Sequence, residues 1–304
     1  MMDIAVFSDI HGNHSALQAC IDYAMGKGIT RFVLLGDYVT DCPNPQKTME
    51  QIYVLKQYFE TYIIRGNREE YLLNYRKNGE GNWKKGSASG SLLYTYENLS
   101  EKDFKFFESL PNYGIFEQKG LPGFEYCHGS PTETAELLFR EKRNTKKVLS
   151  HLKTGVLLHG HNHVQDTYIY RGKKAVNPGS IGIPWYHDGK TQFCILHGDG
   201  KSWEEEYVQL EYDRKEILKE FKNSDFGITM TAQKTAADLG FDKNGVHKVV
   251  STMEQKHFYK SMTSYANHKI WQDVYHVPCG NLILYVKFTQ NVISEFTLLS
   301  FKEK

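Results

Sequence analysis

The sequence has few cysteines, and their spacing does not suggest disulfides or a thiolate metal site. Its 304 residues include five cysteines, an odd number, and none are spaced as Cys-x-x-Cys. No apolar run approaches the ~20 residues that a membrane-spanning helix needs. The formal net charge is only +1, which does not suggest an extended nucleic-acid surface, although a local basic patch could be present. These absences argue against a disulfide scaffold and a membrane span.

The sequence also lacks internal repeats, low-complexity tracts and long runs of one charge. The first residues form a strand pattern without the basic segment and cleavage site of a signal peptide, so we expect a cytoplasmic protein. Hydrophobic residues make up 40% and charged residues 24%, which are ordinary values for a globular protein. The length predicts one large domain or two unequal ones.

Short apolar runs alternate with amphipathic helical patterns in the first third of the chain. The apolar runs lie at residues 4–7, 32–35 and 62–64. Helical spacing is found at 17–24 and 45–59. Continuous apolar strands of this kind favour a buried, largely parallel sheet with helices on it, and hence an α/β fold.

The pattern changes near residue 212. Before it, residues 78–90 are typical of a loop, and Ser100 begins a predicted helix. Further strands are expected at 124–127, 156–158, 167–170, 175–176, 192–196 and 203–210, the last closing the sheet. After it, helical patterns dominate from a helix at 213–221 to about residue 262, and strands follow at 282–289 and 293–301. We therefore predict domains at 1–212 and 213–304.

Carboxylate, amide and imidazole side chains directly follow the apolar runs of the first domain. Loops at the carboxyl ends of strands in an open α/β sheet face one crevice, so we expect these groups to converge. The seven donors are Asp9, His11, Asp37, Asn67, His128, His161 and His163.

This set of donors predicts a metal-dependent hydrolase of phosphate esters. Three oxygen donors and four imidazoles suit Mn, Fe or Zn better than Mg or Ca. A single tetrahedral site needs only four ligands, whereas seven donors with one bridging carboxylate fit two divalent ions that share a hydroxide. Two such ions, ~3.5–4 Å apart, can hold the attacking and leaving oxygens of an in-line displacement at phosphorus.

Each motif taken alone has a simpler explanation. An Asp-x-His or Gly-Asp pair is usually a turn, and a lone histidine such as His128 is more often packed near a sheet edge. Only His161-Asn162-His163 would indicate metal binding by itself as often as not. The order of all five pieces, each directly after an apolar run, favours the metal site. A non-catalytic scaffold is the alternative, and the complete donor set argues against it.

The motifs together resemble a known family. They are Asp9-Ile10-His11, Gly36-Asp37, Gly66-Asn67-Arg68-Glu69, His128 and Gly160-His161-Asn162-His163. This ordered set resembles the calcineurin-like metallophosphoesterases, and more closely their small bacterial phosphodiesterase branch, over residues 1 to about 210. The resemblance implies a β-sandwich flanked by helices and a phosphodiester or nucleotide-type substrate.

The resemblance also implies roles for the individual donors. Asp9, His11 and His163 would hold one metal ion. Asn67, His128 and His161 would hold the other, and Asp37 would bridge them. We expect Asp37, Asn67, Arg68 and His128 to take part in catalysis.

Arg68 departs from the family pattern, because many members have histidine there. Arginine does not lose a proton near neutral pH, so it cannot act as a general acid, but it can clamp a phosphate oxygen. We therefore predict a preference for leaving groups that depart without a proton, such as phosphoanhydrides and aryl esters. The alternative is that Arg68 is a surface residue at a helix start.

Residues 213–304 contain several strings that resemble MqsR-type toxins, which are mRNA endonucleases with a small sheet-and-helix fold. The strings lie at 237–240, 258–263, 270–275, 284–287 and 300–304. The resemblance implies a toxin-like α+β domain in which Lys260, Gln272, Tyr285 and Lys302 act on RNA, with RNA or an antitoxin-like protein as partner.

The chemistry of these four residues alone favours a simpler interpretation. Tyr285 could belong to the core, and Lys302 could be an exposed charge near the end of the chain. If the resemblance holds, the alternative function is an RNA-processing or toxin–antitoxin-related protein. Its C-terminal domain would then bind or cleave RNA, and the phosphoesterase domain would be accessory.

Overall fold

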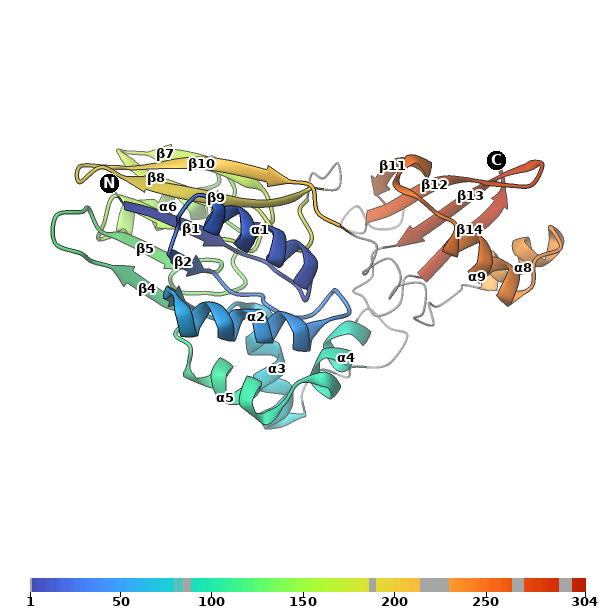
Figure 1. The fold of residues 1–304 in the computed structure, drawn as a ribbon, viewed down its shortest axis with the longest axis horizontal. Helices are drawn as coiled ribbons and strands as arrows, with labels where there is room; N and C mark the ends of the chain where they lie inside the picture. Colours follow the sequence, from blue (N-terminus) through green and yellow to red (C-terminus); the bar gives the residue numbers. More distant parts are fainter. Residues whose placement is uncertain are drawn as a thin grey trace. The chain divides into compact units, whose positions relative to one another are not determined.

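The chain folds into two compact units (Figure 1). The computed structural model describes residues 2–79, 81, 83, 89–185, 190–213, 230–263, 271–289 and 297–304. The first unit comprises Met1–Asn82 and Thr95–Arg214, and the second comprises Trp83–Tyr94 and Lys215–Lys304. No helix in these described ranges is both long enough and apolar enough to cross a membrane.

The first sheet of the first unit has the strand order β10-β9-β1-β2-β3. Its strands are β1 (Met2–Phe7), β2 (Arg31–Leu34), β3 (Glu60–Ile63), β9 (Thr191–Gly198) and β10 (Trp203–Leu210). The three strands from the first third of the sequence are parallel, as the apolar runs predicted. In contrast, β9 runs antiparallel to both β1 and β10, so this sheet is mixed.

The remaining strands form a second sheet with the order β4-β5-β6-β8-β7. They are β4 (Tyr113–Phe116), β5 (Phe124–Cys127), β6 (Val156–Leu158), β7 (Gln165–Tyr170) and β8 (Lys173–Pro178). The single largely parallel sheet expected from the apolar runs was therefore wrong for these strands. A buried run shows that a strand is covered on both faces, but not which sheet it joins. The two sheets match the β-sandwich that the resemblance implied.

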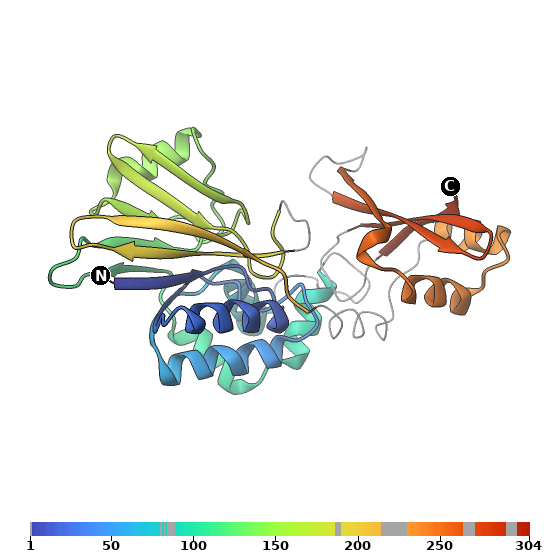
Figure 2. The same cartoon turned by 45° about the horizontal axis from the view of Figure 1, so that its top comes forward.

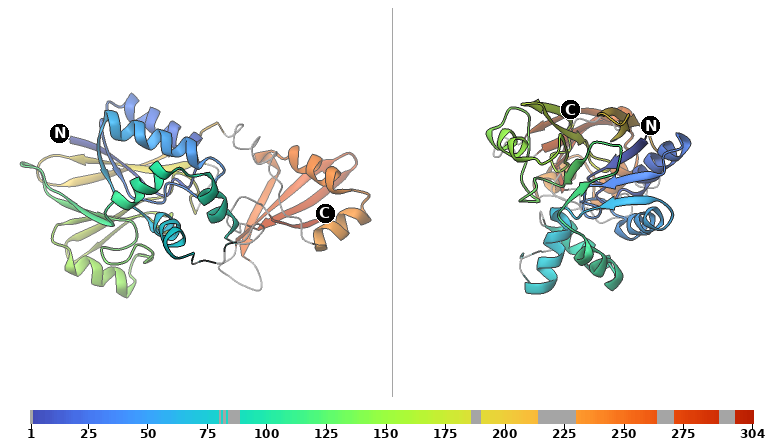
Figure 3. Two further views of the ribbon diagram at one scale, coloured as in Figure 1. Left: turned by 90° about the horizontal axis from the view of Figure 1, so that it is seen from below. Right: turned by 90° about the vertical axis from the view of Figure 1, so that its left-hand side faces the viewer.

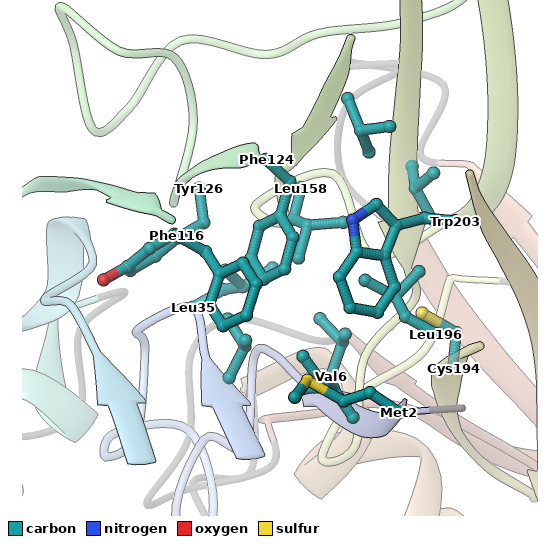
Figure 4. Close-up of a cluster of buried hydrophobic side chains, with 14 of the residues drawn as sticks. Met2, Val6, Leu35, Phe116, Phe124, Tyr126, Leu158, Cys194, Leu196 and Trp203 are labelled. Atoms are coloured by element: carbon teal, nitrogen blue, oxygen red, sulfur yellow. The ribbon is translucent and has the colours of Figure 1, made fainter. Parts of the chain in front are cut away.

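The main hydrophobic core lies between the two sheets (Figure 4). Val6 and Trp203 come from the first sheet, while Phe124 and Leu158 come from the second. The rings of Phe116 and Phe124 are stacked with centroids 4.6 Å apart. Full burial of each such side chain contributes ~1.5–3 kcal/mol, so this core fixes the sheets against each other. The loops at the strand ends thus stand on a rigid base.

Helices cover the outer faces of the sandwich (Figure 2). The first sheet carries α1 (His14–Gly26) and α2 (Pro45–Tyr58), and the second carries α6 (Arg143–His151). The first unit also contains α3 (Asn67–Asn78) and α5 (Glu101–Ser109), whereas α4 (Gly90–Asn98) is divided between the two units after Tyr94. The predicted cap of α5 is present, because the Ser100 N–H donates to Asp103 Oδ2 at 2.8 Å.

The second unit packs two helices on one face of an antiparallel sheet (Figure 3). The helices are α8 (Met230–Asp238) and α9 (Lys243–Ser251), followed by the short 3₁₀ helix η1 (Gln255–His257). The sheet order is β11-β12-β13-β14, with β11 (Phe258–Thr263), β12 (Trp271–Cys279), β13 (Leu282–Thr289) and β14 (Thr297–Glu303). Ala232 and Val246 of the helices pack against Val277 and Leu284 of the sheet.

The structure corrects part of the prediction for this unit. Residues 258–263 form strand β11, although helical patterns were expected as far as 262. A short segment of mixed polarity does not distinguish the two periods. Strand β13 matches the predicted 282–289. Residues 214–221 of the predicted helix and residues 293–296 of the last predicted strand lie outside the described residues.

Candidate metal centre and a basic sheet face

The seven predicted donors converge at the ends of strands from both sheets. They follow β1, β2, β3, β5 and β6, as the sequence predicted. Ligand atoms of Asp9, His11 and His163 lie within 4.8 Å of one another, and the same holds for Asp37, His128 and His161. Asn67 joins the second group, because its Oδ1 lies 3.0 Å from Nε2 of His128. We call these seven side chains the donor cluster.

Short distances connect the two groups of the donor cluster. In the first group, His163 Nε2 lies 3.1 Å from Asp9 Oδ1 and 3.2 Å from His11 Nε2. In the second, His128 Nε2 lies 3.3 Å from Asp37 Oδ2. The groups approach each other where His128 Nε2 lies 3.8 Å from Asp9 Oδ1 and His11 Nε2 lies 3.8 Å from Asp37 Oδ2.

Backbone carbonyls fix which nitrogen two of the imidazoles present to the centre. His128 Nδ1 lies 2.8 Å from the Leu35 carbonyl, and His163 Nδ1 lies 2.9 Å from the Ile183 carbonyl. A carbonyl can only accept a hydrogen bond, so Nδ1 carries the hydrogen in both rings. In the neutral ring, Nε2 then offers a lone pair to the centre, which is the arrangement of a metal-binding histidine.

The donor cluster has the chemistry that a cation requires. Asp9 Oδ1 is buried without a hydrogen-bond partner, and the Nε2 atoms of His11 and His163 point at each other. Burial would lower the pKa of His11, but hydrogen bonds that its ring donates to Asp41 and Asp9 raise it to about 10. Burial likewise opposes the charge on His128, whose pKa Asp37 and Asp9 raise to about 9. The carboxylates thus favour positive charge at these nitrogens, for which protons and metal ions compete.

The backbone around the donor cluster is strained. Asp9, His11, Asp37, His161 and His163 have φ values of 53°, 51°, 53°, 68° and 58°. This left-handed region is uncommon for residues other than glycine and persists only where the surroundings enforce it. Such strain is typical of sites where side chains must be aimed at a fixed point.

One glycine allows two loops of the site to meet. A Cβ atom on Gly66 would lie 2.2 Å from Asp37 Oδ1. The close approach brings Asn67, directly after Gly66, next to the loop that follows β2. Any larger residue at this position must push the two loops apart.

Glu69 forms hydrogen bonds to both of these loops. We did not predict this role from the sequence. Its Oε2 accepts the N–H groups of Asp37 at 2.9 Å and Gly66 at 2.8 Å, and its Oε1 accepts that of Tyr38 at 2.9 Å. Its burial, together with the charge of Asp37, raises the pKa of Glu69 to about 7. The sequence signal was the acidic residue at the third position of α3, where it can close a capping box.

Arg68 lies against the donor cluster. Its side chain is only 21% exposed, and its Nη2 lies 3.1 Å from Asp41 Oδ2. Its backbone N–H donates to Asp37 Oδ1 at 2.8 Å. Sequence reasoning did not single out Asp41, although it follows Asp37 by four residues in the same loop. The guanidinium is thus held beside Asp37 and is not a solvated surface group.

Comparison with known proteins assigns each part of the chain to a family. The family model for the calcineurin-like phosphoesterase superfamily domain matches residues 2–201, and the model for the motility quorum-sensing regulator, toxin of MqsA, matches residues 210–303. The chain therefore belongs to the calcineurin-like phosphoesterase superfamily through its N-terminal part and to the MqsR toxin family through its C-terminal part.

Two curated relatives match different parts of the chain. The uncharacterized protein MJ0912 of Methanocaldococcus jannaschii is 29% identical over 231 residues, which cover 70% of this chain and 88% of the relative. The mRNA interferase toxin MqsR of Escherichia coli (strain K12) is 42% identical over 76 residues, which cover 25% of this chain and 76% of the relative.

Two solved structures share the fold. The hypothetical protein PH1004 of Pyrococcus horikoshii OT3 has a TM-score of 0.64 at 22% identity, covering 73% of this chain and 93% of that one. The metallophosphoesterase of Sphaerobacter thermophilus has a TM-score of 0.58 at 20% identity, covering 81% of this chain and 97% of that one. At these identities the likeness concerns the fold alone.

In the second unit, predicted residues gather on the sheet face opposite α8 and α9. Strand pairing aligns His276 with Tyr285 and Tyr285 with Lys302, while Leu284 and Val286 point to the helices. Lys302 Nζ lies 5.2 Å from the centre of the Tyr285 ring. Tyr285 is therefore not a core residue, and Lys302 lies in a strand.

Two further residues on this face, Tyr259 and His276, were not predicted from the sequence. Tyr259, which is 56% exposed, stacks on His276 with ring centroids 4.2 Å apart. Burial and the nearby charges of Lys304 and Lys260 lower the pKa of His276. We call Tyr259, Lys260, His276, Tyr285 and Lys302 the lysine–tyrosine face. The side chain of Gln272, the fourth predicted residue, lies outside the described part of the structure.

Proposed function

We propose that the first unit is a binuclear metal-dependent hydrolase of phosphodiesters or nucleotide-type phosphoesters. The observation that carries the proposal is the convergence of six carboxylate and imidazole donors, joined by Asn67, near a buried carboxylate oxygen of Asp9 without a hydrogen-bond partner. Two divalent ions, Mn, Fe or Zn, would polarise the phosphate and lower the pKa of water. The donor types fit these metals better than Mg or Ca.

The distances support the assignment of the donors that the family resemblance implied. Asp9, His11 and His163 would hold one ion. Asn67, His128 and His161 would hold the other, and Asp37 would contact both, because its Oδ2 lies 3.8 Å from His11 and 3.3 Å from His128. The carbonyl partners of His128 and His163 orient these rings before any ligand binds.

Arg68 would bind a phosphate oxygen of the substrate and stabilise the negative charge that grows in the transition state. Its guanidinium holds its protons near neutral pH, so it does not protonate the leaving group. Esters and anhydrides whose leaving groups depart as stable anions would then be the preferred substrates. Asp37, Asn67, Arg68 and His128 form the proposed catalytic set.

Metal loading and diester hydrolysis test this function together. The full chain is stripped with a chelator, reloaded with Mn²⁺, and analysed for bound metal and for turnover of bis(p-nitrophenyl) phosphate. We expect about two ions per chain. Asp37→Asn should lower turnover by more than about a hundredfold, because loss of a direct metal ligand should cost more than the ten- to hundredfold that is usual for residues supporting the ligands. Asp22→Asn, an exposed aspartate on α1, is the matched control. A folded, Mn-loaded chain without turnover of any phosphoester in a panel would refute the proposal.

We infer that the domain boundary lies near residue 212, just after the second matched family region begins at residue 210 and close to the end of the first compact unit at Arg214. Limited proteolysis should first cut near this position and leave two resistant fragments. Early cleavage within 1–200 would contradict this boundary. The cytoplasmic location expected from the sequence stays a prediction.

We also propose that the second unit binds RNA through the lysine–tyrosine face. Lysine side chains can neutralise phosphates, and exposed aromatic rings can stack on bases. The alternative in which the phosphoesterase unit is only accessory is not favoured, because the longer family match covers that unit.

Fluorescence anisotropy with a labelled single-stranded RNA tests this second proposal. Lys302→Ala should weaken binding and flatten its salt dependence, since one phosphate contact is lost. Lys234→Ala on α8, also exposed, should behave like the parent chain. Equal affinity of all three proteins for RNA would reject the proposal. An antitoxin-like protein would then be the partner to test.

A further inference from the structure

Asp41 connects a proposed metal ligand to the proposed phosphate-binding residue. It is buried, with 2% of its surface exposed, in the loop that follows β2. Its Oδ2 lies 2.8 Å from His11 Nδ1 and 3.1 Å from Arg68 Nη2. The Thr40 hydroxyl donates to the same oxygen at 3.2 Å. One carboxylate oxygen therefore fixes two side chains that face the donor cluster.

The contact with His11 differs from those of the neighbouring imidazoles. His128 and His163 place Nδ1 against backbone carbonyls, whereas His11 places Nδ1 against the Asp41 carboxylate. A carboxylate in this position makes the imidazole a stronger metal ligand and holds the hydrogen on Nδ1, so that Nε2 faces the centre. Asp41 is thereby placed to raise metal affinity without touching the metal.

The contact with Arg68 leaves one donor of the guanidinium unused. Nη2 is held by Asp41, while Nε is buried without a hydrogen-bond partner. Nε lies 3.9 Å from Asp37 Oδ2, which is too far for a hydrogen bond. Because a buried donor without an acceptor is unfavourable, this N–H suits an anionic oxygen placed beside Asp37.

The backbone holds Asp41 firmly in this position. Thr40 and Asp41 have φ values of 80° and 68°, and the loop is pinned to the first strand-end loop. The Cys42 N–H donates to the His11 carbonyl at 2.8 Å, and the His11 N–H donates to the Asp37 carbonyl at 2.9 Å. Strained residues held in this way are typical of groups whose direction matters.

We propose that Asp41 is a positioning residue that orients Arg68 Nε toward a phosphoryl oxygen of the substrate and strengthens His11 as a metal ligand. The inference rests on the proposed function of the first unit. The ligand class is a phosphoryl group with a free anionic oxygen, and inorganic phosphate is its simplest form. Asp41 acts only through Arg68 and His11, so each effect can be measured apart from turnover.

Calorimetry on the full chain separates the two effects. Mn²⁺ affinity is measured on the stripped chain, and inorganic phosphate affinity on the Mn-loaded chain. Asp41→Asn should weaken both by roughly ten- to hundredfold, as is usual for residues that orient metal ligands. Arg68→Met should weaken phosphate binding and leave Mn²⁺ affinity unchanged. Asp22→Asn should change neither.

The double variant gives the decisive comparison. If Asp41 acts on phosphate through Arg68, Asp41→Asn with Arg68→Met should bind phosphate no more weakly than Arg68→Met alone at saturating Mn²⁺. Independent effects that multiply in the double variant would overturn the proposal, as would unchanged affinities in Asp41→Asn. Should Asp41→Asn fail to fold, Arg68→Lys tests the same geometry. Lysine keeps the positive charge but lacks the planar set of N–H donors of the guanidinium. Unchanged phosphate affinity in Arg68→Lys would also overturn the proposal.

Failure of the proposed function is distinguishable from failure of this inference. A chain that binds Mn²⁺ and phosphate with the expected coupling but hydrolyses no phosphoester retains the role of Asp41 and loses the proposed activity. Conversely, turnover with unchanged affinities in Asp41→Asn keeps the activity and rejects the role of Asp41.

Discussion

The two proposed sites, the donor cluster and the lysine–tyrosine face, hold their side chains in opposite ways. In the donor cluster, the side chains of His11, Asp37 and His128 are at most 2% exposed, and most of the cluster sits on strained backbone. On the lysine–tyrosine face, Tyr259 is exposed and the residues project from the strands of the second unit. A caged set of donors suits small cations and one phosphate, because every direction is fixed. A sheet face suits a long polyanion that makes many weak contacts.

The leaving group should produce the largest effect in the donor cluster. Without a general acid at Arg68, aryl esters should be hydrolysed faster than alkyl esters by about 10²–10⁴-fold, the usual contribution of such an acid. Matched series of aryl and alkyl methyl phosphodiesters, compared by kcat/KM on the Mn-loaded chain, measure this ratio. Equal rates for both series would mean that another group supplies the proton.

The second-largest effect should come from adding a side chain at Gly66, where the loops that follow β2 and β3 meet. Gly66→Ala places a Cβ 2.2 Å from Asp37 Oδ1, so the loops must separate and Mn²⁺ affinity should fall by roughly ten- to hundredfold. Gly26→Ala is the matched control, because nothing lies within 4 Å of the added Cβ. Calorimetry of both variants gives the comparison. Unchanged affinity in Gly66→Ala would show that the cluster tolerates looser loops than the geometry indicates.

A single contact on the lysine–tyrosine face should matter less. His276→Ala removes the ring stacked on Tyr259, and loss of one base-stacking surface is worth about 1–3 kcal/mol. Fluorescence anisotropy should show that His276→Ala binds single-stranded RNA more weakly than the parent chain. The control His151→Ala, on α6 of the first unit, should bind RNA as the parent chain does. If both variants bind RNA like the parent chain, the face does not act through stacking.

The smallest effect should come from His197, near the end of β9 in the first sheet. Burial opposes its charge, but hydrogen bonds to Asp3 at 2.8 Å and Glu206 at 3.1 Å raise the pKa of His197 above its ordinary value. The stabilisation is therefore fully present below the unfolded pKa of about 6.5 and is lost as the pH rises through the folded pKa. Exposure and screening keep it under about 1 kcal/mol.

Thermal unfolding at two pH values measures this small contribution of His197 to the stability of the fold. The parent chain should exceed His197→Gln in melting temperature at about pH 6, where the imidazole is charged, and the gap should narrow at about pH 9. A gap that widens at the higher pH would mean that the neutral ring is the stabilising form. Asp22→Asn should show no such pH dependence.

Strands were predicted correctly where a short segment has a clear apolar or alternating pattern, and they were missed where it has none. Residues 124–127, 156–158 and 203–210 were predicted from apolar or alternating runs and correspond to β5, β6 and β10. Strand β11 was missed because its residues mix polarities, so that neither period dominates. The sheet to which each strand belongs follows from contacts between residues far apart in the chain, which no window of sequence contains.

The sequence alone determined the identity of the donors, their order and their place directly after strands, because these are properties of short segments. It also determined the chemical limit on Arg68, since the pKa of a guanidinium is intrinsic. Only the tertiary structure decided that His11 and His163, 152 positions apart, bring their nitrogens within 3.2 Å. It alone placed Asp41 between His11 and Arg68, because that contact depends on how two strained loops pack.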